Sequence, residues 1–357
     1  MAKQSGDDVI FVGCDDGHDS VKLVTRSLTD KAESSKLTMP SKVVRGSRAI
    51  SLTGDGTSGG VYQTGSDVYT VTDALVGNDL IDTRTINYPT SDINRILVHE
   101  AMIRANLSGK DVRLVTGLPV QDYYRTGEQN KELIEAKKAN LLSKEIRPMA
   151  ANPIANIVAQ SIACEGLAAV YDMAINDDGS DNEDFFKLMR HQPVGVIDIG
   201  GKTIDLAVVG LDYRGQPAVD KDRTRSIDYG MLRVVEQVRA EIQIEHKIDE
   251  ISPRAMARVM SERKMMIYGQ DLSMDDAIAT AISKVTPDLF GRIRTHWKSG
   301  ADLSAVIIVG GGAYALAQTI KDGLFTHATT RNDPEYANAR GMLKMGMRSY
   351  IQSQAQA

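Results

Sequence analysis

The chain has 357 residues, of which 42% are hydrophobic and 25% are charged, and its formal net charge is -5 at pH 7. This length exceeds the usual size of one hydrophobic core and predicts two lobes, while the composition is that of an ordinary water-soluble protein. The acidic balance argues against a broad nucleic-acid surface, and no apolar run approaches the roughly 20 residues of a membrane span, so we expect a cytoplasmic protein.

The first predicted element is a hairpin near the N-terminus. The segment Val12–Val24 consists of an apolar strand, an Asp-x-Gly turn around Asp15 and Gly17, and a second apolar strand. Cys14 within it and Cys164 further on lie in apolar segments, which favours buried thiols over a disulfide or a metal site. A Gly/Ser/Thr-rich span at 51–65 then predicts short strands and turns of a small inserted subdomain.

The middle of the chain alternates helices and strands. The predicted elements are a helix at 91–105, a strand at 112–117, a helix at 128–142 and a small, apolar segment at 152–173. Ser91 can cap the first helix, and Pro119 ends the strand. Gln160 and Glu165 are the polar exceptions of the apolar segment. An acidic, turn-rich run at 176–184 predicts a solvated loop, where we place the boundary between the lobes.

The second half of the chain begins with a repeat of the first hairpin. The segment Val196–Ala207 again reads strand, Asp-x-Gly turn and strand, with Asp198 and Gly200 in the places of Asp15 and Gly17. The later predicted elements are helices at 230–244, 253–266 and 275–297, a strand at 304–309 that runs into three glycines, and a last helix at 334–351.

These elements predict the division of the chain into lobes. Lobe I takes residues 1–190, with a small subdomain inserted at about 38–88, and is completed by the C-terminal helix at 334–357. Lobe II takes residues 191–333, with a smaller subdomain at about 230–299. The fold class that follows from the alternating helices and strands is α/β, in two lobes.

The two hairpins have the chemistry of a phosphate grip. A glycine turn lets backbone N–H groups approach phosphate oxygens without an intervening Cβ atom. An adjacent aspartate repels phosphate but can organise Mg²⁺ and its waters, and this is the role we predict for Asp15 and Asp198. One such turn alone is typical of an ordinary hairpin, but two at equivalent points of separate lobes, with a triple-glycine strand end, indicate a nucleotide clamp.

Further residues complete the predicted site. Lys22 can reach the β-phosphate, and Thr203 can donate its hydroxyl to the γ-phosphate; Lys202 either adds charge there or faces solvent. Gln160 is our candidate to orient the attacking water, with a buried structural amide as the alternative. The predicted catalytic residues are Gln160, Asp198 and Asp15, and those that bind the cofactor are Asp16, Gly17, His18, Asp19, Lys22, Gly200, Gly201, Lys202, Thr203, Gly311, Gly312 and Ala313.

These motifs resemble those of the actin, sugar-kinase and heat-shock-chaperone ATPases, which have a ribonuclease H-like, two-lobed actin-like fold. The phosphate-1 motif matches 15–23, the phosphate-2 motif 198–205 and the adenosine motif 306–313. Within this superfamily the chain is most similar to the ParM/StbA branch of bacterial actins, through Asp15-Asp16-Gly17 and the segments at 118–124, 137–140, 197–201 and 309–313. Ala339-Arg340-Gly341-Met342 looks like the second hinge connection of that fold.

The resemblance implies an ATPase whose Mg-ATP-dependent filaments segregate plasmid DNA, with GTP as an alternative nucleotide. It also implies self-association head to tail and a ParR-like adaptor that binds the DNA, so that contact with plasmid DNA is indirect and no membrane is involved. One departure is expected, because ParM sequences carry a glutamate at the water-orienting position where we place Gln160.

Two other functions stay open on the sequence alone. A non-filamentous adaptor of the division or pilus type needs a membrane-seeking amphipathic end, whereas the tail at 352–357 consists of Ser, Gln and Ala. A small-molecule kinase needs a general base in the cleft, for which Asp205 or Asp16 is the candidate.

Overall fold

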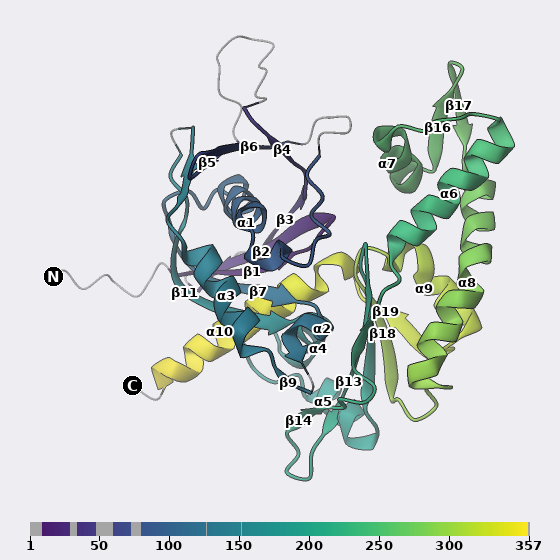
Figure 1. Ribbon diagram of the computed structural model, residues 1–357. Coiled ribbons are helices and arrows are strands. Elements are labelled where there is room, and N and C mark those ends of the chain that lie inside the picture. The colour runs from purple at the N-terminus through teal and green to yellow at the C-terminus, as the bar shows by residue number, and fades with distance from the viewer. Residues whose placement is uncertain are drawn as a thin grey trace.

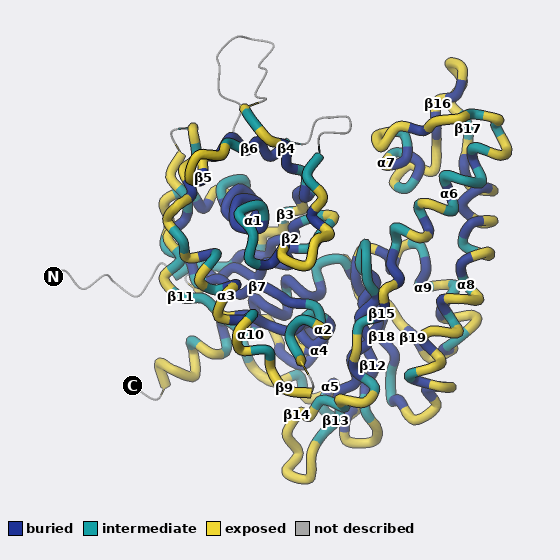
Figure 2. The backbone as a smooth tube through the Cα atoms, viewed as in Figure 1, coloured by how far each residue is buried: buried dark blue, intermediate teal, exposed yellow. Residues whose placement is uncertain are grey.

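The computed structural model describes residues 9–28, 34–47, 60–72, 80–125, 127–150 and 152–355. Most of the Gly/Ser/Thr-rich span predicted at 51–65 lies outside the described residues. The chain forms two lobes side by side, each built on a sheet (Figure 1). The strands at the centre of both lobes are buried (Figure 2).

The sheet of the first lobe contains the first predicted hairpin. Its strand order is β11-β7-β1-β2-β3, with β1 at Ile10–Asp16, β2 at Ser20–Ser27, β3 at Ser35–Pro40, β7 at Asp111–Leu118 and β11 at Asn156–Cys164. The strands β1, β2 and β3 form an antiparallel meander, whereas β7 and β11 are parallel to β1. The carboxyl ends of β1, β7 and β11 therefore meet at one edge.

The sheet of the second lobe has the same topology. Its strands lie in the order β14-β13-β12-β18-β19, with β12 at Val194–Ile199, β13 at Ile204–Leu211, β14 at Pro217–Val219, β18 at Ala305–Val309 and β19 at Ala328–Thr330. The strands β12, β13 and β14 are again an antiparallel meander, and β18 and β19 are parallel to β12. A short strand β15, Arg225–Ile227, pairs with β13. The repeated hairpin is thus part of a repeated sheet.

A small antiparallel sheet covers the first lobe on one side. It has the order β10-β5-β6-β4, from β4 at Val43–Arg45, β5 at Val61–Thr64, β6 at Asp67–Val71 and β10 at Ile146–Pro148. A 3-10 turn, η1 at Tyr88–Thr90, leads into α1, Asp92–Arg104, whose first turn is capped by Ser91 as predicted.

The helix predicted at 128–142 begins later than expected. The short helix α2, Val120–Tyr123, is followed in the chain by β8, Tyr124–Arg125. Residues Glu128–Gln129 form β9, which pairs with β8. The helix α3 then runs over Lys131–Leu142, because Asn130 accepts a hydrogen bond from the Leu133 N–H and so caps it.

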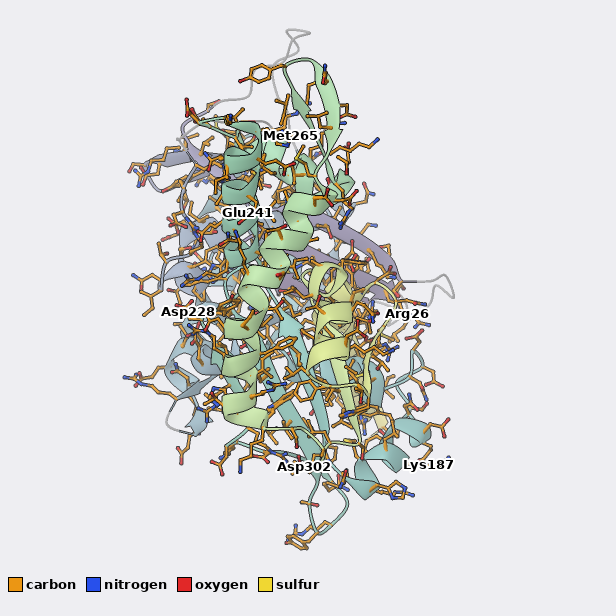
Figure 3. The ribbon with its side chains drawn as sticks, turned by 90° about the vertical axis from the view of Figure 1, so that its right-hand side faces the viewer. Arg26, Lys187, Asp228, Glu241, Met265 and Asp302 are labelled. Carbon is orange, nitrogen blue, oxygen red and sulfur yellow. The ribbon has the colours of Figure 1, made fainter. Side chains whose placement is uncertain are left out.

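Helices and a hairpin form the outer part of the second lobe. They are α6 at Met231–His246, α7 at Pro253–Glu262, β16 at Lys264–Ile267, β17 at Gln270–Ser273 and α8 at Asp275–Trp297. The predicted helix at 253–266 ends at Glu262, because Arg263 adopts a left-handed conformation with φ 58° and the chain turns into β16. Figure 3 shows α6 and α8 side by side, where Glu241 of α6 pairs with Lys284 of α8 at 2.7 Å.

The last helix returns to the first lobe. The chain passes through α9, Ala313–Gly323, and η2, Pro334–Tyr336, into α10, Ala337–Ala355. A Cβ atom at Gly13 of β1 would lie 1.9 Å from the Ala339 carbonyl oxygen, so this close approach requires glycine. Beside it, α4 at Leu167–Ala174 contributes Asp172, a buried carboxylate paired with Arg340 and Lys344 of α10.

The acidic run before the second hairpin and the two cysteines were also assigned from the sequence. The acidic loop at 176–184 is shorter than predicted, because Asn182 caps α5, Glu183–His191. Cys14 and Cys164 are both buried thiols, as expected. Among the described residues, no helix combines the length and the apolar character that spanning a bilayer requires. The division into lobes near residue 190 stays a prediction.

Candidate functional site

A cavity of about 680 Å³ lies between the turns of the two hairpins. Of the predicted site residues, those that line it are Asp15, Gly17, His18, Asp19, Lys22, Asp198, Gly200, Gly201, Lys202, Thr203, Gly311 and Gly312. Asp16, Gln160 and Ala313 do not line it. The structure therefore brings most of the sequence-predicted residues, from both halves of the chain, to one place.

The first hairpin presents a carboxylate and a cation to this cavity. Asp15 and Lys22 lie opposite one another in the β1–β2 register, and the Lys22 ammonium is 3.6 Å from a carboxylate oxygen of Asp15. Burial lowers the pKa of Lys22, but the carboxylates of Asp15 and Asp198 outweigh it, so that the net shift is upward. The Ser41 hydroxyl donates to the carbonyl of Gly17 at 2.7 Å and fixes the turn.

The second hairpin faces the first across the cavity. Its turn is closed by the Gly200 N–H, which donates to the Thr203 carbonyl at 3.0 Å. A Cβ atom at Gly201 would lie 3.3 Å from the Cβ atom of Asp19, so the two turns approach closely. Lys202 reaches further and donates from its ammonium to the Arg84 carbonyl at 3.2 Å. Lys202 thus contacts the other lobe. That it adds positive charge at the γ-phosphate stays a prediction.

His18 joins the first hairpin to the segment before α1. Its Nδ1 atom lies 2.7 Å from the Thr83 carbonyl, the Thr83 hydroxyl donates to the His18 carbonyl at 2.6 Å, and the ring lies 4.8 Å from that of Tyr88. Burial lowers the pKa of His18, which favours the neutral imidazole.

Besides the exposed Asp19, four carboxylates line the cavity, those of Asp15, Glu165, Asp198 and Asp205. Burial raises the pKa of all four; that of Asp198 rises to about 6 and that of Asp205 to about 7, in both cases with help from a neighbouring aspartate. Asn338 donates to Asp198 at 2.6 Å and Ser226 donates to Asp205.

This concentration of buried negative charge fits a bound divalent cation, which would stabilise the ionised carboxylates. Among the described residues, however, no three acidic, histidine or cysteine side chains are grouped closely enough to hold a metal by themselves. A magnesium ion here would need phosphate oxygens and waters as its other ligands, which is the coordination that Mg²⁺ usually keeps with nucleotides.

The triple glycine and apolar side chains from three helices also line the cavity. Gly310 has φ +83°, and a Cβ atom there would lie 2.4 Å from a carboxylate oxygen of Asp198; at Gly312 it would lie 2.2 Å from the Ile199 side chain. The triple glycine is therefore packed directly against the second hairpin. The apolar wall consists of Met231, Leu232 and Val235 of α6, Met260 of α7, and Ile278 and Ile282 of α8. In the sequence, only the apolar face of the helix predicted at 230–244 indicates such a wall, and it was not predicted as part of the site.

Gln160 does not line the cavity, so the structure does not support the prediction that it orients the attacking water. It lies in the middle of β11 opposite Leu114 of β7, and neither polar atom of its buried amide group has a partner. Glu165, just beyond the end of β11, lines the cavity. At about 3.3 Å per residue, the five steps along the chain from Gln160 to Glu165 span about 16 Å. Glu165 therefore replaces Gln160 as our candidate.

Asp16 and Ala313 also have roles other than those predicted. Asp16 turns away from the cavity, and its carboxylate pairs with Lys137 at 2.7 Å and accepts a hydrogen bond from Asn94 at 2.5 Å. Ala313 is the buried first residue of α9. Asp16 turns away because a β-strand directs successive side chains to opposite faces, and Asp15 takes the face toward the cavity.

Comparison with known families divides the chain in two. Residues 10–176 match the family described as plasmid segregation protein ParM, N-terminal, and residues 196–322 match the archaeal actin homologue MreB-like, C-terminal. The chain is a ParM-type actin-like protein. No curated protein sequence matches it significantly.

Solved structures of ParM and other actin homologues share the fold. A 15-stranded ParM filament from Clostridium botulinum is 18% identical with a TM-score of 0.74, covering 95% of this chain and 99% of the other. An archaeal actin homologue in complex with ADP is 15% identical with a TM-score of 0.72 at the same coverage, 95% and 99%. A ParM quadruple mutant described as non-polymerisable is 16% identical with a TM-score of 0.71, again covering 95% and 99%.

Proposed function

We propose that this ParM-type protein is an ATPase that assembles into nucleotide-dependent filaments and segregates plasmid DNA. The observation that carries the proposal is the convergence of two glycine-turn hairpins, two lysines and five carboxylates on one cavity between the lobes. The ParM match over residues 10–176 and the ParM filament structure with the same fold support the filament part. The adaptor is a ParR-like DNA-binding protein, and contact with DNA is indirect.

The chain's own residues divide the work of hydrolysis. The glycine turns at Gly17 and Gly201 bring backbone to the phosphates from both lobes, and Lys22 supplies positive charge. Asp15 and Asp198 would hold Mg²⁺ through its waters, and bound Mg-ATP would supply the phosphoryl group and the charge that joins the lobes. Glu165 would orient the attacking water. The apolar wall would surround the adenine base of the nucleotide. GTP is the alternative nucleotide.

Nucleotide then controls assembly through the relative position of the lobes. A ligand that contacts both lobes favours the arrangement in which those contacts are made together. A subunit fixed in that arrangement can present matching surfaces at opposite ends, and head-to-tail contacts that do not close into a ring build a helical filament. Hydrolysis and loss of phosphate remove one connection between the lobes and weaken the filament.

The test is right-angle light scattering and pelleting of the purified protein with Mg²⁺ and ATP, GTP, ADP or a slowly hydrolysed ATP analogue. We expect a triphosphate-dependent rise that decays as phosphate is released. The variant Asp198→Ala should impair hydrolysis far more than folding, as followed by phosphate release and circular dichroism. Binding and turnover without assembly over a wide concentration range would contradict the proposal and favour the adaptor or the kinase.

A further inference from the structure

A buried lysine outside the cavity connects two strand ends beneath it. Lys137 of α3 is 2% exposed, and its ammonium lies 2.7 Å from the Asp16 carboxylate at the end of β1. The same ammonium donates a hydrogen bond to the carbonyl of Gly117 near the end of β7. One side chain from a third element thus holds the ends of two neighbouring strands.

This connection begins where the backbone ladder stops. The parallel pairing of β1 with β7 runs from Ile10 and Val112 to Cys14 and Thr116, and does not extend to Asp16 and Gly117. Asp15 and Gly17, on either side of Asp16, line the cavity, as does Pro119, two residues after Gly117. These cavity residues therefore lie at the ends of β1 and β7. There Lys137 holds the two strands together where no backbone hydrogen bonds of the sheet do so.

We propose that Lys137 is a positioning residue for nucleotide phosphates, an inference that rests on the proposed nucleotide-binding function. Neither Lys137 nor its partners Asp16 and Gly117 line the cavity, so Lys137 acts through the backbone of the first hairpin. If the first hairpin shifts, it loses hydrogen bonds to charged phosphate oxygens, and losing such a bond lowers ligand affinity by up to about 100-fold. The apolar wall belongs to α6, α7 and α8 of the other lobe, and its position does not depend on the contacts of Lys137.

The variant Lys137→Met removes the connection and should lower ATP affinity about 100-fold, measured by titration calorimetry. Adenosine, which has no phosphate, should bind with unchanged affinity, measured by ligand-observed NMR. A general loss of structure would lower both affinities together. The neighbouring Lys138, half-exposed and paired with Glu135 at 2.8 Å, provides the matched control, because Lys138→Met should change neither affinity.

The single variant leaves the Asp16 carboxylate buried without its cation, which can prevent folding. The double variant Lys137→Met/Asp16→Asn removes both charges and should recover the melting temperature while ATP affinity stays low. The inference is overturned if Lys137→Met binds ATP like the wild type, if ATP and adenosine affinities fall equally in the folded double variant, or if that variant recovers ATP affinity. Failure of the wild-type protein itself to bind ATP would instead refute the proposed function.

Discussion

Replacing Glu165 by Gln separates catalysis from stability at the cavity. The substitution keeps the shape of the side chain and its position beyond β11 but removes the charge. Loss of a group that orients or activates the attacking water typically costs about 100-fold or more in rate. A 100-fold loss corresponds to about 2.7 kcal/mol of activation free energy. We therefore expect ATP hydrolysis to fall by at least this factor, while ATP binding persists and filaments stop decaying.

The same substitution should stabilise the nucleotide-free protein at neutral pH. Burial, and then the charges of Asp15 and Asp205, hold the pKa of Glu165 well above its usual value. A raised carboxyl pKa means that the folded state binds the proton more tightly, so stability is lost as pH rises from the unfolded pKa, about 4.3, through the folded pKa. The glutamine amide of Glu165→Gln does not ionise, and the variant should therefore be the more stable one above that range.

Phosphate release, light-scattering decay and thermal unfolding at pH 4 and pH 8 measure these effects. The matched control is Gln160→Leu, which changes the residue first predicted for this role and should leave hydrolysis unchanged. Wild-type turnover in Glu165→Gln, or a loss of turnover in Gln160→Leu comparable to it, would refute the assignment. Equal stability of Glu165→Gln and wild type at both pH values would refute the electrostatic reasoning.

Two other predictions concern the last helix and the metal. Asp172→Asn leaves Arg340 and Lys344 without their buried partner, so the free energy of unfolding should fall by about 3–5 kcal/mol in denaturant titrations. The control Asp184→Asn, at an exposed pair with Lys187, should have no measurable effect. Similar values for both variants would contradict the role of the buried cluster. With Mg²⁺ present, ATP at about 100 times its Kd should stabilise the protein by about 2.7 kcal/mol. Chelation by EDTA should remove most of this gain in thermal shift, and equal stabilisation with and without EDTA would contradict a metal-assisted site.

Local patterns were sufficient to predict the hairpins and most of the helices. The Asp-x-Gly turns need only a few consecutive residues, and the apolar periodicity of residues 275–297 gave both ends of α8. The limits of α3 and α7 were less accurate, because they depend on Asn130 as a cap and on the left-handed Arg263. Both features are local, but they compete with helix propensity on either side.

The parts of the site that were missed depend on contacts distant in sequence. Whether Gln160 or Glu165 reaches the cavity depends on where β11 ends, because Gln160 lies in the middle of the strand and Glu165 just beyond its end. Asp16 and Asp15 are chemically equivalent in the sequence, and only the placement of Lys137 on α3 shows which one is paired for structure. The apolar wall combines residues of three helices. In each helix the apolar residues that face the cavity have the same spacing as those that face the core, so the sequence does not distinguish them.

The return of α10 to the first sheet determines the order in which the lobes can be completed during synthesis. Phe11 and Val24 of the first hairpin share a hydrophobic cluster with Ala339, Leu343 and Met347, which leave the ribosome more than three hundred residues later. The second sheet is contained within residues 194–330 and can form before α10 emerges. Domains generally fold as units as they emerge during synthesis, but here the N-terminal sheet must wait with one face uncovered until α10 is made. Premature termination before α10 would therefore expose that face and Gly13, even though both hairpins had already been synthesised.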